Sequence, residues 1–469
     1  MHTSTTSTVP LVSWTAAQLL EATQGYWLND QAPNTEIKRI LTDSRDAEAG
    51  DAFLALKGER FDAHAFITQV AEQGCQVAIV SQPIDAEMCQ LVVPDTRLAL
   101  GQLGAYRRAQ NPQLKVIALT GSSGKTTTKE MLGSILSRIA PTLVTRGNLN
   151  NDLGVPVMLL ELHPEHQYAV MELGASHQGE IDYTSNLVQP LVAGIINIGT
   201  AHLGEFGGRD GICRAKSEIY AHIAPNGTSI VPAADDFADS IRQAVQTEQV
   251  LSFGAGGEIF ATEIELQAQS ATFKLNTPQG VRQVNLPFAG EHNVQNATAA
   301  AAFALAIGIS LDDIVLGLEQ AVGAKGRLNF IQQGRHLLID DTYNANPTSM
   351  RAAAEVLAQQ EGVRVMVMGD IGELGSSAAQ QHYMLGRDLV SVKGLNFVVA
   401  VGEFAPAAQE GARSTQYGKK MQAFLTQEQA LPFLLSLIET HQPQSMSFLF
   451  KGSRYTHMET LMADLMEKL

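Results

Sequence analysis

The feature that most constrains the fold of this chain is a glycine-rich segment, TGSSGKTTT, at residues 120–128. Residues 114–120 before it form an apolar run typical of a buried strand, and the residues after it have helical periodicity. In such a strand–loop–helix unit, backbone N–H groups and the helix N-terminus bind a phosphate. The segment therefore predicts a nucleotide site on an α/β sheet. A glycine and serine turn with an incidental lysine is the alternative.

Within this segment, Lys125 is the residue expected to reach the β- and γ-phosphates, and the Thr126 hydroxyl is expected to bind Mg²⁺. One position departs from the full phosphate-loop pattern, because Leu119 stands where that pattern has glycine. The residues assigned to nucleotide binding here are Thr120, Gly121, Ser122, Ser123, Gly124, Lys125, Thr126 and Thr127. The following helix is predicted to bury one face, made of Met131, Leu132, Ile135, Leu136 and Ile139.

The rest of the chain alternates strand-like and helix-like segments. Apolar runs at residues 168–172 and 191–198 lie between helical stretches, which predicts a mostly parallel sheet. Residues 259–286 alternate apolar and polar side chains and predict an antiparallel annex. Further on, four apolar runs each end in a small or polar residue, as strands of a doubly wound sheet do at a ligand crevice. They are residues 336–341, 363–370, 396–403 and 447–453.

Length and these patterns together predict an α/β protein of three domains. A chain of 469 residues has room for about three domains of ordinary size. We expect a small N-terminal α/β domain at residues 1–112. A central phosphate-loop domain, with a mostly parallel sheet and the antiparallel annex, should span residues 113–325. A C-terminal, doubly wound Rossmann-like domain should span residues 326–469.

Composition narrows the classes of partner. The formal net charge of −16 opposes nonspecific binding to nucleic acid or to an anionic membrane. The most apolar long stretch, residues 297–309, is too short to span a membrane and is expected to be a buried helix. The first ten residues lack the pattern of a secretory signal, and the three cysteines are scattered. We therefore expect a cytoplasmic protein.

Further polar residues follow the predicted strands and helices. Glu172 and His202 each follow an apolar strand, so a carboxylate and an imidazole are candidates to complete a Mg²⁺ site. A buried carboxylate and a histidine that only forms hydrogen bonds are equally compatible with this pattern. Lys216 lies on a predicted helix, where a lysine usually faces solvent.

Amide side chains mark two more candidate positions. Asn148, Asn150 and Asn151 form a polar loop that either holds a substrate or is a turn cluster. The first turn of the alanine-rich helix carries the imidazole of His292 and the amides of Asn293 and Asn296. The amides are suited either to reading a base edge or to capping the helix. Beyond this helix, Arg327 is suited to a forked contact with a γ-phosphate across a domain boundary.

Eight motifs occur in a fixed order along the chain: TGSSGKTTTKE, GNLNNDLGVP, MELGASH, the AHL histidine, RAKSEI, GEHNVQNATAA, KGR and DDTYNANPTSM. In these motifs the chain resembles the Mur ligases of bacterial cell-wall synthesis, and the resemblance covers all three regions. It also accounts for Leu119, because these ligases have a shorter glycine signature than other phosphate-loop proteins.

The resemblance implies an ATP-dependent ligase that forms an amide bond through an acyl phosphate. Within the family, it points to the members that add D-alanyl-D-alanine to UDP-N-acetylmuramoyl-tripeptide. It implies ATP and two Mg²⁺ ions as cofactors, CO₂ as a carbamate on Lys216, and a cytoplasmic monomer. The N-terminal region should bind the UDP end of the substrate. The C-terminal region should bind the dipeptide and close on ATP.

The resemblance also implies a role for each matching residue. The catalytic set is Lys125, His202, Lys216 and Arg327, and the Mg²⁺ ligands are Thr126, Glu172, His202 and carbamylated Lys216. ATP should also contact His292, Asn293, Asn296, Arg327, Asp341 and Tyr343. The expected substrate-binding residues are Ser44, Arg45, Asn151, Ser176, His177, Asn344, Asn346 and Ser349. The TDSR and KGERFD segments, at residues 42–45 and 57–62, match family motifs of the N-terminal region.

Two other functions remain as alternatives. The first is the sibling ligase that adds a diamino acid to UDP-N-acetylmuramoyl-dipeptide. That enzyme usually carries a DNPR-like segment, and this chain has GDIGELG around Asp370 instead. The second is a nucleotide-switched binding protein. A GTPase of that class would carry an NKxD motif, which this sequence lacks.

Overall fold

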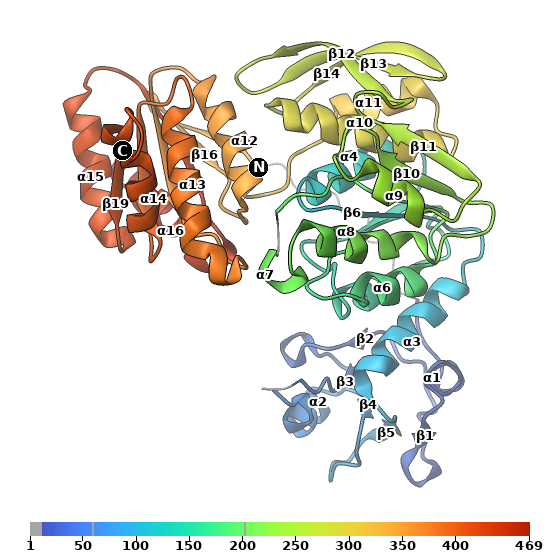
Figure 1. Ribbon diagram of the computed structural model, residues 1–469. Helices are drawn as coiled ribbons and strands as arrows, with labels where there is room; N and C mark the ends of the chain where they lie inside the picture. Colours follow the sequence, from blue (N-terminus) through green and yellow to red (C-terminus); the bar gives the residue numbers. More distant parts are fainter. Residues whose placement is uncertain (1–11, 59–60, 201–202) are drawn as a thin grey trace.

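The computed structural model describes residues 12–58, 61–200 and 203–469, and these form three domains (Figure 1). Each domain has its own mostly parallel sheet, so the predicted α/β class and three-domain organisation are confirmed. The exact domain limits stay predictions. In Figure 1 the N-terminal domain lies below the central domain, and the C-terminal domain lies beside the central one.

The N-terminal domain has a five-stranded sheet in the order β1-β5-β4-β3-β2. All neighbouring strands are parallel except β1, which runs antiparallel to β5. The elements are α1 (Ala16–Thr23), β1 (Tyr26–Trp27), β2 (Ile40–Leu41), β3 (Ala52–Leu54), α2 (Ile67–Glu72), β4 (Val77–Val80), β5 (Cys89–Val92) and α3 (Thr96–Ala109).

The central domain is built on a fully parallel six-stranded sheet in the order β11-β10-β9-β6-β8-β7. Its first half comprises β6 (Lys115–Thr120), α4 (Lys125–Ser137), β7 (Thr142–Val144), α5 (Gly154–Leu160), β8 (Tyr168–Glu172), α6 (Glu180–Val188) and β9 (Val192–Ile195). Its second half comprises α7 (Leu203–Phe206), α8 (Arg209–Ser217), β10 (Thr228–Pro232), α9 (Ala238–Ala244) and β11 (Gln249–Phe253).

A three-stranded antiparallel sheet follows, as predicted, with β12 (Phe260–Leu266), β13 (Ala271–Thr277) and β14 (Gly280–Leu286). It packs over α10 (Glu291–Ala306) and α11 (Leu311–Glu319) at the top of Figure 1. The alanine-rich α10 is buried, as expected from the sequence, and its small side chains let it lie against α4.

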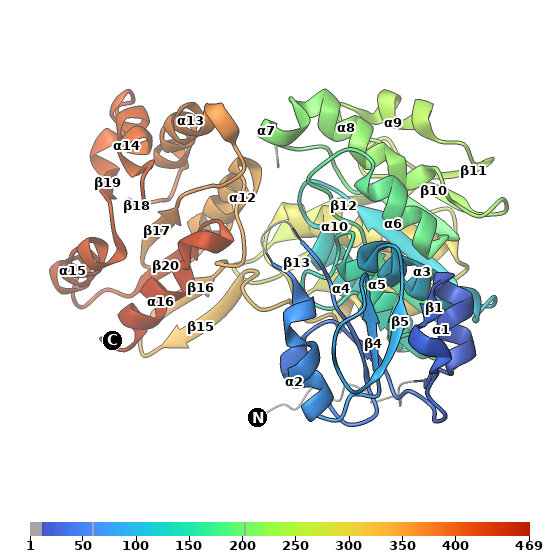
Figure 2. The ribbon, with the colours of Figure 1, turned by 90° about the horizontal axis from the view of Figure 1, so that it is seen from below.

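The C-terminal domain has the sheet order β15-β16-β20-β17-β18-β19, in which only β15 runs antiparallel to its neighbour. Its strands are β15 (Asn329–Gln333), β16 (His336–Asp340), β17 (Val363–Gly369), β18 (Phe397–Val401), β19 (Met421–Phe424) and β20 (Met446–Lys451). Its helices are α12 (Pro347–Ala358), α13 (Ala378–Ser391), α14 (Ala405–Arg413), α15 (Gln427–Thr440) and α16 (Met458–Met466). Figure 2 shows these helices on both faces of the sheet.

Strand β6 explains why the phosphate loop is held rigidly. Its side chains alternate between two apolar cores, with Ile117 and Leu119 in one and Val116 and Ala118 in the other. A strand that is buried on both faces is a continuous run of apolar residues, so this strand could be predicted from the sequence. The predicted face of α4 is correct at Met131, Leu132, Ile135 and Leu136, which are fully buried.

Ile139 is the exception on that face. Helix α4 ends at Ser137, so Ile139 lies beyond the last helical turn and is 42% exposed. Its predicted burial is wrong, because helical spacing places a residue on a helix face only while the helix continues.

The N-terminal and central domains share an apolar seam along α3. Leu160 of α5 belongs to the core of the N-terminal domain, together with Leu100 and Leu103 of α3. Gly104 allows this approach, since a Cβ there would lie 3.1 Å from the backbone of Pro156. The contacts of the C-terminal domain with the central domain include polar ones, such as Thr200 with Thr348 at 3.4 Å between their hydroxyl oxygens. No helix among the described residues is both long and apolar enough to cross a membrane.

Candidate active site

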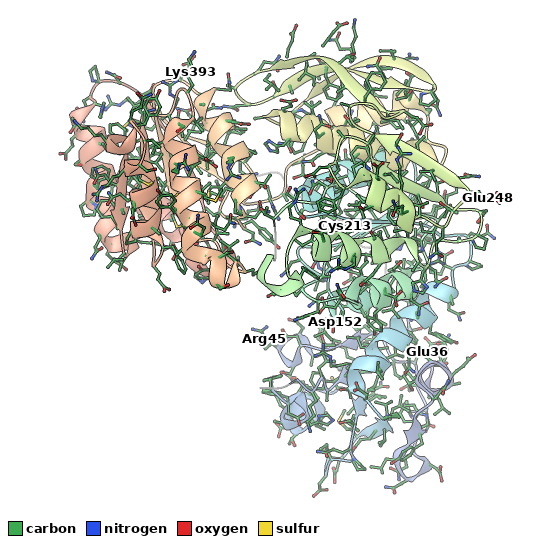
Figure 3. All side chains as sticks on the ribbon, viewed as in Figure 1. Glu36, Arg45, Asp152, Cys213, Glu248 and Lys393 are labelled. Carbon is green, nitrogen blue, oxygen red and sulfur yellow. The ribbon has the colours of Figure 1, made fainter. Side chains whose placement is uncertain are left out.

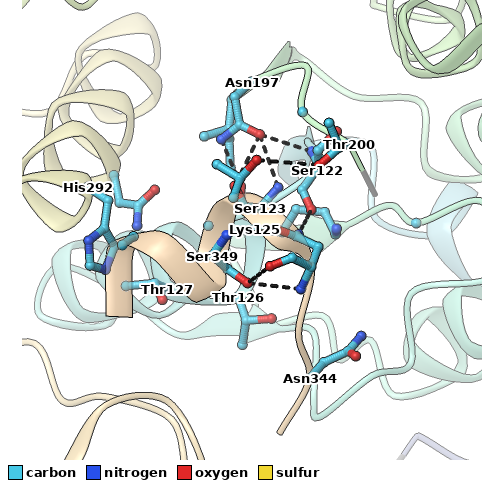
Figure 4. Close-up of a pocket in the computed structure, with 18 of the residues that line it drawn as sticks. Ser122, Ser123, Lys125, Thr126, Thr127, Asn197, Thr200, His292, Asn344 and Ser349 are labelled. Atoms are coloured by element: carbon cyan, nitrogen blue, oxygen red, sulfur yellow. Dashed lines mark hydrogen bonds between the residues drawn. The ribbon is translucent and has the colours of Figure 1, made fainter. Parts of the chain in front are cut away.

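One large cleft of about 1140 Å³ lies at the carboxyl ends of the central strands and extends to the C-terminal domain. Its walls include the phosphate loop, the first turns of α10 and α12, and the segment that joins the two domains. Figure 4 shows Lys125 and Thr126 of the loop, His292 of α10 and Ser349 of α12 around this space. Side chains far apart in the sequence therefore meet in one site.

Most of the residues selected from the sequence line this cleft. Those that line it are Ser122, Ser123, Gly124, Lys125, Thr126, Thr127, Asn151, Glu172, Ser176, Lys216, His292, Asn293, Asn296, Arg327, Asp341, Tyr343, Asn344, Asn346 and Ser349. Thr120 and Gly121 lie at the buried base of the loop. His202 lies outside the described residues, as do Glu59 and Arg60 of the KGERFD segment.

The geometry of the loop follows from its glycines and its lysine. Gly124 adopts a φ of +79° just before α4, and a Cβ there would collide with the Asn296 amide oxygen. The Lys125 ammonium donates to the Gly121 carbonyl at 2.8 Å, so the loop closes on itself. Burial lowers the pKa of Lys125, which the negative charge of Glu172 partly offsets.

Glu172 is held in place by two donors at the end of β8. The Thr126 hydroxyl donates to its Oε2 at 3.1 Å, and the Asn150 amide donates to its Oε1 at 2.7 Å. Asn150 is therefore the member of the asparagine loop that contacts this carboxylate. Asn151 instead accepts from the Gly154 backbone N–H at 2.8 Å, which is a turn contact at the start of α5.

Lys216 does not face solvent, so the ordinary expectation for a helical lysine is wrong here. It is 2% exposed on α8 and lines the cleft. Burial, reinforced by the positive charge of Lys125, holds the pKa of Lys216 well below its usual range. A lysine in this setting is a neutral amine over a wider pH range than an exposed one.

The amides of α10 are not helix caps, because Gly290 occupies the N-cap position. Asn293 donates to the Ala289 carbonyl at 2.8 Å, and Asn296 donates to the Asn293 side-chain oxygen at 3.0 Å. His292 stands beside them in the cleft, and burial lowers the pKa of His292 to about 4. The cleft thus presents a neutral imidazole and amides on one wall.

The pKa of His292 gives a pH prediction. Its pKa in the folded chain lies below the ordinary value of 6.5, so the unfolded chain binds a proton more readily. The neutral imidazole therefore contributes stability that is complete above about pH 6.5 and is lost as the pH falls towards 4, by about 2–3 kcal/mol in total. NMR titration of the histidine ring protons should give His292 a pKa near 4. A pKa in the usual histidine range would contradict this.

The segment joining the two domains brings Arg327 to the loop. One guanidinium nitrogen of Arg327 donates to the Thr126 hydroxyl at 3.4 Å, and the guanidinium lies 4.4 Å from the centre of the Tyr343 ring. Its Nε is buried without a hydrogen-bond partner among the described residues. Arg327 therefore lies beside the phosphate loop, and its Nε–H is available to donate a further hydrogen bond.

Asp341 and Asn346 come from the C-terminal domain. Asp341 pairs with Lys451 at 2.7 Å, and both are buried. Asn346 caps α12 in a reciprocal pair with Ser349, and its amide donates to the Ser122 carbonyl at 3.5 Å. The C-terminal domain thus contacts the phosphate loop directly.

The remaining candidates lie at or beyond the edge of the cleft. Ser176 donates its backbone N–H to Glu180 at 2.7 Å, and the exposed ring of His177 pairs with the same carboxylate at 3.0 Å. Ser44 and Arg45 belong to the N-terminal domain and do not line the cleft. Arg45 is 85% exposed, pairs with Asp43, and lies at the edge of its domain that faces the other two (Figure 3).

Asn197 is a residue that the sequence analysis missed. It follows β9, and its side-chain oxygen accepts from the backbone N–H groups of Ser122 and Ser123 at 3.1 and 3.0 Å. Its amide donates back to the Ser123 carbonyl at 3.0 Å, so the loop is tied at three points (Figure 4). The only signal for it was its position after a strand adjacent to the loop.

These contacts predict that Asn197→Ala loosens the phosphate loop and weakens ADP binding roughly tenfold, because it removes several hydrogen bonds that shape the loop. Calorimetric titration with ADP would measure the change, with Asn186→Ala on the exposed face of α6 as the matched control. Equal affinity for ADP in the Asn197 variant and in the control would show that the hydrogen bonds of Asn197 have no role in binding.

Three profiles of one family match this chain. They are described as the Mur ligase family catalytic domain at residues 36–119, the Mur ligase middle domain at residues 119–304, and the Mur ligase glutamate ligase domain at residues 326–454. A curated protein of Escherichia coli strain K12, UDP-N-acetylmuramoyl-tripeptide–D-alanyl-D-alanine ligase, is 41% identical over 461 residues. That match covers 97% of this chain and 99% of the relative.

Solved structures agree with the sequence matches. A crystal structure of MurF from Acinetobacter baumannii has 76% identity and a TM-score of 0.95, covering 98% of this chain and all of that one. The structure of MurF ligase from Thermotoga maritima in complex with ADP has 25% identity and a TM-score of 0.79. It covers 92% of this chain and 97% of its own.

Proposed function

This chain belongs to the Mur ligase family, and from that premise we propose that it joins D-alanyl-D-alanine to UDP-N-acetylmuramoyl-tripeptide at the expense of ATP. The products are the UDP-linked pentapeptide used in peptidoglycan synthesis, ADP and phosphate. The observation that carries the proposal is the 41% identity, over nearly the whole chain, to a ligase of that specificity. The cleft supplies the matching chemistry, since a phosphate loop faces groups from a second domain.

The chemistry has to overcome charge repulsion. The substrate carboxylate attacks the γ-phosphorus of ATP, which gives an acyl phosphate and releases ADP. Both reactants are anions, so positive groups must lie where negative charge gathers in the transition state. Lys125 and Arg327 are cations that contact the loop, the first at the Gly121 carbonyl and the second at the Thr126 hydroxyl. We assign both to the γ-phosphate.

The second step forms the amide bond. The amino group of the dipeptide attacks the acyl carbon, and phosphate leaves with the proton that the nitrogen gives up. Water must be kept out at this stage, because it would hydrolyse the acyl phosphate. Contacts across the domain boundary, such as Asn346 with Ser122, support a role for the C-terminal domain in closing over the loop.

The residues present fit Mg²⁺. Thr126 and Glu172 bring one hydroxyl and one carboxylate oxygen within 3.1 Å of each other beside the phosphate loop. Mg²⁺ commonly takes one or two protein oxygens and completes its octahedron with phosphate oxygens and water. When bound there, the cation neutralises the phosphate charge. Among the described residues no cluster of three or more His, Cys, Asp or Glu side chains forms a metal site.

A second Mg²⁺ with His202 and a carbamylated Lys216 is part of the proposal. The amine of Lys216 attacks CO₂ only when it is neutral, and the burial of Lys216 favours that form. The carbamate would return a negative charge next to Lys125. Within this proposal, the carbamate accounts for a buried lysine at this position.

The other residues complete the assignment. We propose that His292, Asn293 and Asn296 bind adenine, with Asp341 at the ribose and Tyr343 near the base. Ser44 and Arg45 are assigned to the UDP end. Asn151, Ser176 and His177 are assigned to the peptide stem, and Asn344, Asn346 and Ser349 to the dipeptide. The enzyme is proposed to work as a monomer in the cytoplasm, which supplies ATP and keeps thiols such as its three free cysteines reduced.

The decisive experiment measures Mg²⁺-dependent phosphate release from ATP with UDP-N-acetylmuramoyl-tripeptide. Three reactions are compared: the UDP-tripeptide with D-alanyl-D-alanine, the UDP-linked dipeptide with diaminopimelate, and the UDP-tripeptide with no acceptor. Release that requires the dipeptide supports the proposal. Release with diaminopimelate on a UDP-linked dipeptide would move the chain to the sibling activity, and ATP hydrolysis indifferent to every muramoyl substrate would favour a nucleotide-switched protein.

A further inference from the structure

Lys129 is a buried lysine that the proposed chemistry does not use. It lies on α4, one turn beyond Thr126, and its side chain is only 1% exposed. It does not line the main cleft, so it has no contact with a nucleotide or substrate held there. Burying an ammonium costs free energy unless its partners replace the water that it loses. The partners of Lys129 therefore indicate its role.

The ammonium of Lys129 has two partners. It donates to the Thr145 backbone carbonyl at 2.7 Å and forms an ion pair with the Glu130 carboxylate at 2.7 Å. Glu130 is the next residue of α4, and its side chain is 35% exposed, so the ion pair reaches the surface. The other contact runs inward, to the residue that follows β7. Lys129 thus connects α4 to the end of β7.

Strand β7 has few hydrogen bonds of its own to hold it. It is three residues long, lies at the edge of the central sheet and pairs with β8 alone among the described strands. Helix α4 lies close to this strand, since a Cβ at Gly133 would be 3.0 Å from the side chain of Val144. The end of a short edge strand moves more freely than a central strand unless another element holds it. The side chain of Lys129 provides that hold.

Thr145 connects Lys129 to Glu172. The Thr145 hydroxyl accepts from the Glu172 backbone N–H at 2.9 Å and donates to the Val170 carbonyl at 3.3 Å. Thr145 is itself 1% exposed, so water does not compete for these bonds. Glu172 is the last residue of β8. The position of Thr145 therefore determines where the backbone of Glu172 lies.

These contacts form a closed ring with α4. The Thr126 hydroxyl donates to the Glu172 carboxylate at 3.1 Å, and the Glu172 N–H donates to Thr145. The carbonyl of Thr145 accepts from Lys129. Thr126 and Lys129 are three residues apart in α4, so they lie on the same face of the helix. The helix and the ends of β7 and β8 are thus held in place relative to one another.

We propose that Lys129 is a positioning residue for Mg²⁺, because it acts through Thr145 to set the separation of the Thr126 hydroxyl and the Glu172 carboxylate. This inference rests on the proposed function, which assigns those two groups to the cation. Mg²⁺ requires short bonds in a nearly ideal octahedron, so a small shift of one ligand weakens its binding. Removing a residue that holds a metal ligand typically lowers metal affinity by about 10- to 100-fold.

Lys129→Met tests the inference, because methionine is similar in length but donates no hydrogen bond. Mn²⁺ serves as a paramagnetic probe of the Mg²⁺ site, and its binding to the complex of the whole chain with ADP is followed by electron paramagnetic resonance. The Kd of Mn²⁺ should rise roughly tenfold. The Kd of ADP, measured by calorimetry without any metal, should not change, because Asn197 still holds the phosphate loop.

Steady-state kinetics separates positioning from a general loss of structure. The Mg²⁺ concentration that gives the half-maximal rate should rise by the same factor as the Kd of Mn²⁺. Saturating Mg²⁺ should restore kcat, since neither metal ligand is removed. A lysine that only stabilised the fold would lower the Tm and leave the Mg²⁺ dependence of the rate unchanged.

Substitutions of Thr145 provide a second test, which holds even if the Lys129 variant does not fold. Thr145→Val removes the hydroxyl that accepts from Glu172, keeps the carbonyl bonded to Lys129, and should weaken Mn²⁺ to a similar extent. Thr145→Ser keeps the hydroxyl and should bind Mn²⁺ normally. The matched control is Lys115→Met at the start of β6, where an exposed lysine donates to the Ile307 carbonyl at 3.4 Å. It should change neither the Mn²⁺ nor the ADP affinity.

Three results would overturn the inference. Unaltered Mn²⁺ affinity in folded Lys129→Met or in Thr145→Val would show that the path to Glu172 does not affect the metal. If Lys129→Met weakened metal-free ADP as much as Mn²⁺, Lys129 would support the phosphate loop instead. A failure of the proposed metal site itself is distinguishable, because the unaltered ADP complex would then bind no Mn²⁺ at all.

Discussion

Lys125→Ala is expected to reduce turnover by about a thousandfold or more while the chain stays folded. The ammonium of Lys125 lies 2.8 Å from the Gly121 carbonyl of the phosphate loop. Preorganised charge of this kind stabilises the transition state of phosphoryl transfer by several kcal/mol. The fold should survive because Lys125 makes its hydrogen bond only to the loop, and the core of the central domain is formed by apolar side chains of β6 and α4.

Phosphate release under saturating substrates would measure the loss, and circular dichroism would check the fold. The matched control is Lys393→Ala, an exposed lysine on the surface of the C-terminal domain (Figure 3), which should keep full activity. Lys125→Arg keeps the charge but changes its shape, so it should recover only part of the rate. An alanine variant with near-normal turnover would place the phosphate site elsewhere.

Lys216→Ala is expected to lower turnover at least about a hundredfold, because it removes the amine that we propose carries CO₂. A short carboxylate such as acetate or formate, added at high concentration, should restore part of the activity by standing in for the carbamate. Bicarbonate should not, since the alanine cannot form a carbamate. The unaltered enzyme should lose activity when CO₂ is removed and when the pH is lowered enough to protonate Lys216.

The sign of that pH effect follows from burial. Burial holds the pKa of Lys216 well below the usual lysine range, so the neutral amine extends to lower pH than in an exposed lysine and is lost on acidification. Mass spectrometry under mild conditions would detect the added CO₂ directly. If no carboxylate rescued the alanine variant and CO₂ removal had no effect, Lys216 would be a positioning lysine rather than a modified one.

The fold could be predicted where the hydrophobic pattern of a segment is compatible with only one type of secondary structure. Strand β8 at Tyr168–Glu172 matches its predicted limits, because a run buried on both faces has an unambiguous sequence. Ile139 marks the limit of periodicity, which gives the face of a helix but not the residue at which it ends. The short strands of the N-terminal domain, such as β1 and β2 with two residues each, left no readable pattern at all.

The site was predictable where local sequence carries the chemistry. Residues 120–127 predict a phosphate site from their own order, and the structure places most of them in the cleft. Asn197 and Lys451 could not be assigned in the same way, because their importance comes from strands that lie next to one another only in the folded sheets. Lys451 meets Asp341 across the parallel pair of β16 and β20, which are more than a hundred residues apart in the chain. The burial of Lys216 likewise depends on tertiary packing around α8.

The apolar seam along α3 has a mechanical consequence. Because α3 and α5 share one core, the first two domains resist separation much as the two halves of a single domain do. The contacts of the C-terminal domain with the central one include the hydrogen bonds of Thr348 with Thr200 and of Asn346 with Ser122, and such bonds exchange readily with water. We therefore expect the C-terminal domain to move against a unit formed by the first two domains. A compound bound between the central and C-terminal domains would block domain closure and so inhibit the reaction. A compound could enter the α3 seam only if part of the protein unfolded.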